Sequence, residues 1–140
     1  FVKALEATFT KPLADMKSSL GVMVPIGLAK GPLSNVVRER LQGNVALIDR
    51  GSISFTEKIA TAHEAGASGV VVINNIDSEP IRMSGNGYFD IPAVMISKRL
   101  GQSIKETIAS KKNVLVNFVY PINNTTSIFK IPKLARRVEK

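Results

Sequence analysis

The chain has 140 residues, of which 44% are hydrophobic, and its formal net charge is +8. This length and composition fit one globular domain and exclude a wholly disordered chain or two large cores. The absence of cysteine excludes disulfides and thiolate metal sites, and no apolar run approaches the roughly 20 residues that cross a bilayer.

The first part of the chain gives weak local signals. Residues 4–9 alternate loosely between apolar and polar side chains and predict a first strand. Residues 21–29 are apolar but contain Pro25 and Gly27. Because proline cannot donate a ladder hydrogen bond, we expect an edge strand or an irregular segment there. Residues 36–41 are compatible with either a short helical turn or an extended piece.

The middle of the chain has the order strand, helix, strand. Residues 45–48 and 70–73 are continuous apolar runs that predict buried strands. Between them, Ser54 and Glu57 have the spacing of a capping box at a helix start, and Gly66 is a natural helix stop. This order predicts a pair of parallel strands joined by a crossover helix.

The second half predicts another strand, helix and strand after a long polar connection at 74–90. A loop of that length inside a compact domain is usually functional or mobile. We expect a strand over 91–96, a helix capped by Ser97, and an alternating strand over 114–120. The apolar face of this second helix has four members: Leu100, Ile104, Thr107 and Ile108.

Two groups of residues resemble one known sequence pattern. The first comprises Asp49-Arg50-Gly51, Phe55, Lys58, Ala65-Gly66-Ala67 and Val70 to Asn75, and the second comprises Ile91 to Ser97 followed by Gly101. In order and spacing they are similar to the protease-associated (PA) domain, a non-catalytic module of secreted and membrane-anchored peptidases. Ile53 stands where the family frequently has Cys. In this respect the chain looks most like the PA domains inserted in bacterial subtilisin-like serine proteases.

The resemblance implies an α/β fold with three β/β/α layers, a partly parallel sheet and two main helices. It covers roughly 44–108, and we expect residues 1–122 to form the PA-like domain and 123–140 to form a basic tail or linker. The tail carries five basic residues and one acid. Its residues 127–134 could add a strand or lie against the body of the domain.

The resemblance also implies a role outside catalysis. We expect the domain to govern substrate access or protein–protein interaction in a secreted or cell-surface peptidase, with no cofactor and no metal of its own. Its partners would be the catalytic domain of the parent peptidase, a peptide or protein substrate, and a second copy of itself. The candidate partner-binding residues lie after the first buried strand and in the long connection: Arg50, Gly51, Ser52, Asn75, Met83, Tyr88 and Phe89. Removal of 83–89 should change partner affinity without unfolding the domain.

Structural roles compete with binding roles at several of these positions. Arg50 could form an internal salt bridge with Asp49 or Asp77, or bond loop carbonyls, instead of binding a carboxylate. Tyr88 and Phe89 could equally fold back over the core. Outside the candidate set, Lys58 is expected to be solvated or structural. The single histidine, His63, is expected at the surface near a helix end, and no partner pattern supports a catalytic role for it.

Two other classes of function stay open. One is a free-standing, receptor-like module that binds peptides. The other is binding of nucleic acid or an anionic surface through the basic tail. The tail has no interleaved aromatic platform for base stacking, which disfavours nucleic acid.

Overall fold

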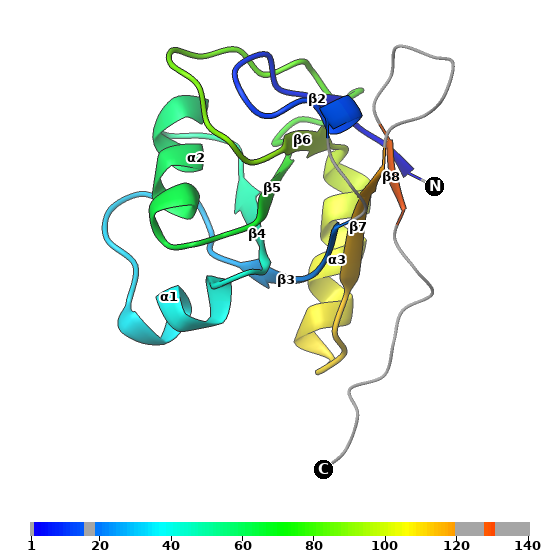
Figure 1. Cartoon of the computed structure of the whole chain (residues 1–140). Coiled ribbons are helices and arrows are strands. Elements are labelled where there is room, and N and C mark those ends of the chain that lie inside the picture. The colour runs from blue at the N-terminus through cyan, green and yellow to red at the C-terminus, as the bar shows by residue number, and fades with distance from the viewer. Residues whose placement is uncertain (1, 16–18, 120–127, 131–140) are drawn as a thin grey trace.

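The computed structural model describes residues 2–15, 19–119 and 128–130. Three α-helices and eight strands alternate along these segments (Figure 1). The strands are β1 (Val2–Lys3), β2 (Leu5–Glu6), β3 (Ser19–Pro25), β4 (Val45–Asp49), β5 (Gly69–Ile73), β6 (Ala93–Ile96), β7 (Leu115–Val119) and β8 (Ile128–Lys130). The helices are α1 (Asn35–Leu41), α2 (Phe55–Glu64) and α3 (Lys98–Ala109), with a short 3-10 turn at Leu13–Asp15.

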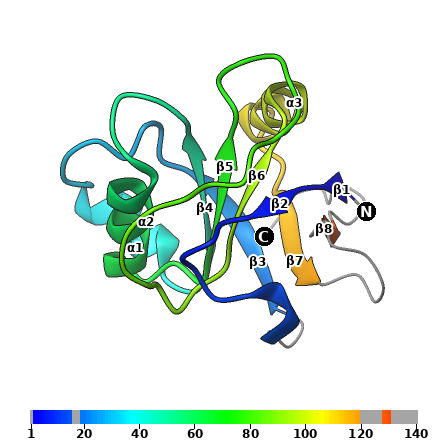
Figure 2. The same ribbon diagram turned by 90° about the horizontal axis from the view of Figure 1, so that it is seen from above.

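The strands pair in the order β1-β8-β7-β3-β4-β5-β6-β2. The four central strands, β3 to β6, are parallel, and the flanking strands pair antiparallel to them or to one another. Seen from above, α1 and α2 lie on one side of the parallel strands and α3 lies on the other (Figure 2). The α/β fold class with a partly parallel sheet is therefore confirmed.

The expectation of an edge strand at 21–29 was wrong, because β3 lies inside the sheet. Residues 19–22 pair with β7, and residues 23–25 pair with β4. Ile26 N donates to Leu47 O of β4. Because successive backbone N–H groups of a strand point to opposite neighbours, the nitrogen of Pro25 points toward the β7 side, at a level beyond the first residue of β7. Proline is tolerated there because no neighbouring strand needs its missing N–H.

Each helix begins at a serine whose hydroxyl accepts a backbone hydrogen bond. At α2 the predicted capping box is present: Ser54 Oγ accepts from Glu57 N, and the Glu57 carboxylate accepts from Ser54 N. Ser34 caps α1, which settles the undecided segment 36–41 as helix, and Ser97 caps α3 as predicted. These caps fix where each strand-to-helix turn ends.

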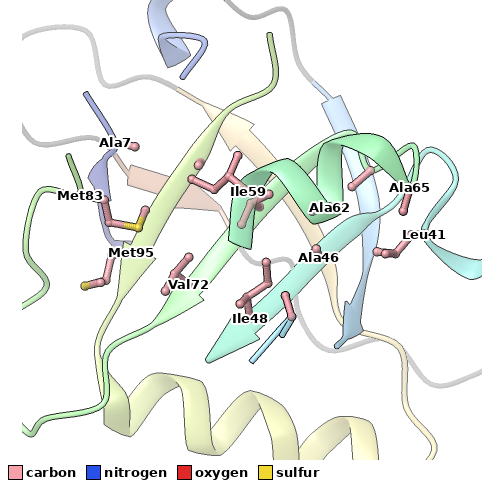
Figure 3. Close-up of a cluster of buried hydrophobic side chains, with 14 of the residues drawn as sticks. Ala7, Leu41, Ala46, Ile48, Ile59, Ala62, Ala65, Val72, Met83 and Met95 are labelled. Atoms are coloured by element: carbon pink, nitrogen blue, oxygen red, sulfur yellow. The ribbon is translucent and has the colours of Figure 1, made fainter. Parts of the chain in front are cut away.

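The two faces of the parallel strands bury two cores. On the α2 side, Ile59 and Ala62 pack on Ala46, Ile48 and neighbouring strand residues (Figure 3). On the α3 side, the helix contributes Ile104, Leu100 and Ile108, which are three of the four residues expected on its apolar face. They pack against the alternate residues of the strands: Val45, Leu47, Val71, Ile73, Val94 and Ile96. Alternate strand residues thus face opposite cores, which is why the strands are apolar throughout.

Strand β8 lies within the segment assigned to the tail, and it pairs antiparallel with β7 and with β1. A strand within 127–134 was one of the two expected outcomes. Tyr120, Pro121 and most of 123–140 lie outside the described residues, so the division at residue 122 stays a prediction.

We expect Gly101→Ala to lower the free energy of unfolding. A Cβ at Gly101 in α3 would meet Ile73 Cγ2 at 2.3 Å, with two further Ile73 carbons within 2.8 Å. Overpacking typically costs ~1–3 kcal/mol, and better helix propensity returns about 1 kcal/mol, so we expect a net loss of up to ~2 kcal/mol.

Urea unfolding of a double-mutant cycle checks this expectation. Ile73→Ala removes the carbons in the way, so Ile73→Ala/Gly101→Ala should lose less stability than the sum of the single changes. Ser103→Ala, at an exposed position on the same helix, controls for helix propensity. If the losses in free energy of unfolding of the two single variants simply add in the double variant, the Ile73 side chain is not what excludes a Cβ at position 101.

Candidate functional site

The carboxyl ends of β4 and β5 lie side by side at one edge of the sheet. Asp49 ends β4 and leads into Arg50, Gly51 and Ser52, while Asn74 and Asn75 follow β5. In open parallel sheets this edge is where ligands usually bind. The structure therefore brings four predicted site residues, Arg50, Gly51, Ser52 and Asn75, into one region.

The turn between β4 and α2 has an unusual backbone. Gly51 has φ 127°, a value that glycine adopts more readily than other residues, and the exposed Ser52 has φ 71°. Ile53 N donates to Gly51 O at 2.8 Å, which closes the turn before Ser54 starts the helix. A non-glycine residue held in the left-handed region is a mark of a tightly determined and often functional turn.

Asn74 is the buried polar group at this edge. Its backbone N donates to Ile96 O at the end of β6. Its side chain accepts from Arg50 Nη1 at 2.8 Å and donates from Nδ2 to Glu79 O at 3.2 Å. Sequence reasoning selected the neighbouring Asn75, which is exposed, and overlooked Asn74.

Arg50 is held inside the domain by this contact. Its guanidinium carbon lies 5.8 Å from the centre of the Phe55 ring, and its backbone N donates to Ile73 O. Arg50 thus makes an internal contact, but its partner is the Asn74 side-chain amide and not the acid or loop carbonyl that was expected. Asp49 instead pairs with Lys105, with Nζ and Oδ1 2.7 Å apart.

Lys58 is completely buried, although lysine is one of the residues least often found inside proteins. Its Nζ donates to Leu28 O at 2.7 Å, which ties α2 to the connection after β3. Burial lowers the pKa of Lys58, while the carboxylates of Asp49 and Glu57 oppose that shift. Lys58 is therefore structural, and the alternative of a solvated side chain was wrong.

The long connection does not present its three candidates together. Met83 is fully buried in the α2-side core, beside Ala7 and Met95 in Figure 3. Its carbonyl accepts a hydrogen bond from Thr8 N. Met83 is therefore a core residue and not the exposed binding residue that its place among the candidates implied. Removing 83–89 would take out part of the core, so it would not leave the fold intact.

Phe89 folds back and Tyr88 does not. The Phe89 ring makes edge-to-face contacts with Phe9 and with the exposed His63, with centroids 6.1 and 5.7 Å apart. Tyr88 is 60% exposed. Phe89 contacts His63 in the last turn of α2, whereas Ser52 lies just before the first turn of that helix. Phe89 is therefore about one helix length, ~15 Å, from the turn after β4. The surface placement predicted for His63 is confirmed.

A small cavity of about 210 Å³ opens at the carboxyl edge on the α3 side. Asp49, Asn74 and Asn75 line it from the sheet, and Lys98, Gln102 and Lys105 line it from α3. Its polar lining can hold a peptide amide or a carboxylate by hydrogen bonds. Sequence reasoning missed the three α3 residues, although their spacing of four and three places them on one helix face.

The acidic side chains of the long connection do not gather into a site. Asp77 and Glu79 are exposed, and Asp90 lies 3.8 Å from Lys11 Nζ. Within the described residues, no three histidine, aspartate or glutamate side chains are close enough to share a metal ion. Across the same segments, no helix has the length and apolar character needed to cross a bilayer.

The fold and this edge define an α/β module whose polar turn and cavity suit binding. The family model of the PA domain matches residues 10–104. The chain therefore belongs to the PA domain family, as its two sequence motifs predicted.

Several relatives place the domain in larger proteins. The chain is 35% identical over 96 residues to C5a peptidase of Streptococcus pyogenes serotype M3, covering 68% of this chain and 8% of that protein. It is 41% identical over 81 residues to signal peptide peptidase-like 3 of Arabidopsis thaliana, covering 54% and 15%. It is 34% identical over 116 residues to the human E3 ubiquitin-protein ligase RNF133, covering 78% and 30%. The chain thus spans less than a third of the length of each of these relatives.

A solved structure has the same fold. The zinc aminopeptidase BSAP of Bacillus subtilis matches with a TM-score of 0.63 and 20% identity, over 88% of this chain and 32% of that one. At this identity the likeness concerns the fold alone.

Neighbouring asparagines provide a matched test of the edge. Asn74→Ala should lower the free energy of unfolding by about 2 kcal/mol, because it removes the acceptor of the Arg50 guanidinium hydrogen bond and one of the donors to the Glu79 carbonyl. Asn75→Ala, at an exposed position, should change it by less than about 0.5 kcal/mol. Denaturant unfolding of both variants measures the difference, and equal losses would refute the role given to Asn74.

The buried Lys58 predicts a specific dependence of stability on pH. Since its pKa is lowered in the folded protein, the unfolded chain binds more protons between that lowered pKa and the ordinary value of 10.5. The free energy of unfolding should therefore rise with pH through this window, relative to that of Lys58→Met.

Unfolding in urea from about pH 7 to about pH 10 tests this dependence. Lys30→Met, at an exposed position, controls for the loss of one positive charge. Stability curves of the wild type and Lys58→Met that run parallel over the whole range would contradict the prediction.

Proposed function

We propose that this PA domain is a non-catalytic domain of a secreted or cell-surface peptidase and governs which protein substrates reach the catalytic domain. The observation that carries the proposal is the 35% identity to C5a peptidase over 68% of the chain. Since the chain corresponds to only 8% of that relative, the reaction would be carried out by another part of the parent protein.

We further propose that the catalytic partner is a subtilisin-like serine protease. The support is the motif itself, in which Ile53 replaces the cysteine frequent in the family and no cysteine occurs elsewhere in the chain. Such a domain does not depend on a disulfide framework, so its stability comes from the two cores and the buried polar contacts.

The turn after β4 and the adjoining cavity are the surface best suited to contact substrate. Ser52 and Asn75 are exposed, while Arg50 is held from beneath by Asn74. Because the turn is fixed before a ligand arrives, little conformational entropy is lost on binding. Lys98 and Gln102 add donors and an acceptor for the main chain or a carboxylate of a peptide.

A second candidate is a receptor-like module that binds proteins without an attached peptidase. The observation that favours it is the 34% identity to an E3 ubiquitin-protein ligase over 78% of the chain. The same edge would then select the bound protein directly.

Kinetics of the full-length parent protein test the access role. Asn75→Trp places a bulky ring on the exposed edge, so kcat/KM for a folded protein substrate should fall about tenfold, because contacts away from the scissile bond are lost. The value for a short peptide that spans only the scissile bond should change less than about twofold. Glu64→Trp, at an exposed position at the other end of α2, is the matched control.

The alternatives predict different results. Equal losses for both substrates, or no loss for either, would refute the access role. A parent protein with no proteolytic activity, whose binding to a protein ligand is weakened by Asn75→Trp, would support the receptor-like module instead.

A further inference from the structure

A second concave surface lies at the opposite end of the sheet from the turn after β4. It is a cleft of about 530 Å³, within the range of ligand sites in proteins. Its apolar floor comes from β3 and α3, through Val22, Pro25 and Ile108. Figure 1 shows α1 and the last turn of α3 at this same end, with β3 between them.

The charged residues that line this cleft all have one sign. Arg40 comes from the last turn of α1, and Lys111 and Lys112 come from the turn after α3. Among the residues that the structure describes, no aspartate or glutamate lines the cleft, although α1 and α3 both carry acids elsewhere. Arg40 and Lys112 are exposed, and in the part of the chain that the structure describes neither forms an ion pair. The cleft is thus a mostly polar depression, with a small apolar floor and cations on two sides.

Basic residues at helix ends often serve only to satisfy the last carbonyls. That explanation is weak at α3, because backbone N–H groups and the Ser110 hydroxyl already bond its final carbonyls, those of Glu106, Thr107 and Ile108. At α1, the carbonyl of Arg40 accepts from Asn44 Nδ2, and Asn44 N donates to Leu41 O. The cationic side chains at this end are therefore not required as helix caps.

We propose that this cleft binds an acidic peptide segment of a partner protein, with one apolar side chain on the floor and flanking carboxylates paired with Arg40 and Lys112. Two features of the cleft favour an acidic peptide as its ligand. The apolar floor can hold a peptide side chain, and the cations can pair with carboxylates. Nucleic acid fits less well, because none of the described residues that line the cleft is aromatic, as base stacking would require.

Fluorescence anisotropy with a labelled short peptide, one leucine flanked by glutamates, tests the proposal. Arg40→Glu/Lys112→Glu should weaken binding about tenfold or more, because two attractive charge pairs become repulsive. Lys30→Glu/Arg99→Glu changes the net charge equally at exposed positions outside the cleft and should weaken binding less than about threefold. Circular dichroism and urea midpoints confirm that both variants are folded.

Three outcomes would overturn the proposal. One is no measurable binding by the wild type at low salt. Another is equal weakening in the two charge-reversed variants, which would indicate attraction to net charge alone. The third is an oligothymidylate that binds at least as tightly as the peptide and whose binding is weakened by the same substitutions.

Replacing the peptide's leucine with glutamate should also weaken binding, since the floor would lose its apolar contact.

Discussion

The buried carboxamide of Asn74 is the group on which the geometry of the carboxyl edge depends. It joins four segments, because its backbone bonds the end of β6 and its side chain bonds both Arg50 and the carbonyl of Glu79. A carboxamide offers an acceptor to the guanidinium and a donor to a carbonyl at once. The positions of the turn after β4 and of the start of the long connection both follow from this one side chain.

A second buried contact fixes the opposite flank of the same turn. Lys58 places a cation among apolar residues, and the Leu28 carbonyl together with nearby Asp49 offsets part of the cost of burying it. Asp49 also pairs with Lys105 on α3, so its carboxylate influences both sides of the sheet. The motif residues Asp49, Arg50 and Lys58 therefore build the edge, while the neighbouring Ser52 and Asn75 are exposed, as the proposed recognition role requires. This division agrees with the occurrence of similar chains in proteins as different as a peptidase and a ubiquitin ligase.

The sequence predicted those features that depend on neighbours in the chain. The capping box of Ser54 and Glu57 and the apolar strands are local patterns, and they appear where expected. The burial of Met83 was not predictable, because it follows from pairing with Thr8, far away in the chain. The interior position of β3 was missed because Pro25 normally indicates an edge, and here the partner strand changes before that residue. The sequence left Lys58 as either solvated or structural, because only the fold shows the Leu28 carbonyl to which its Nζ donates a hydrogen bond.

The two ends of the parallel strands differ in chemistry. At the carboxyl edge, Asp49 is paired with Lys105, and the cavity is also lined by the uncharged polar side chains of Asn74, Asn75 and Gln102. Such a surface selects by hydrogen-bond geometry. At the amino edge, the cations lining the cleft surround an apolar floor without acids among them, so attraction there is longer in range and sensitive to salt. The two proposed surfaces are separated by the length of the sheet, so a substrate bound at one would not compete with a partner segment bound at the other. Both surfaces are built on the same parallel strands, which hold their geometry in a small domain with no cysteine.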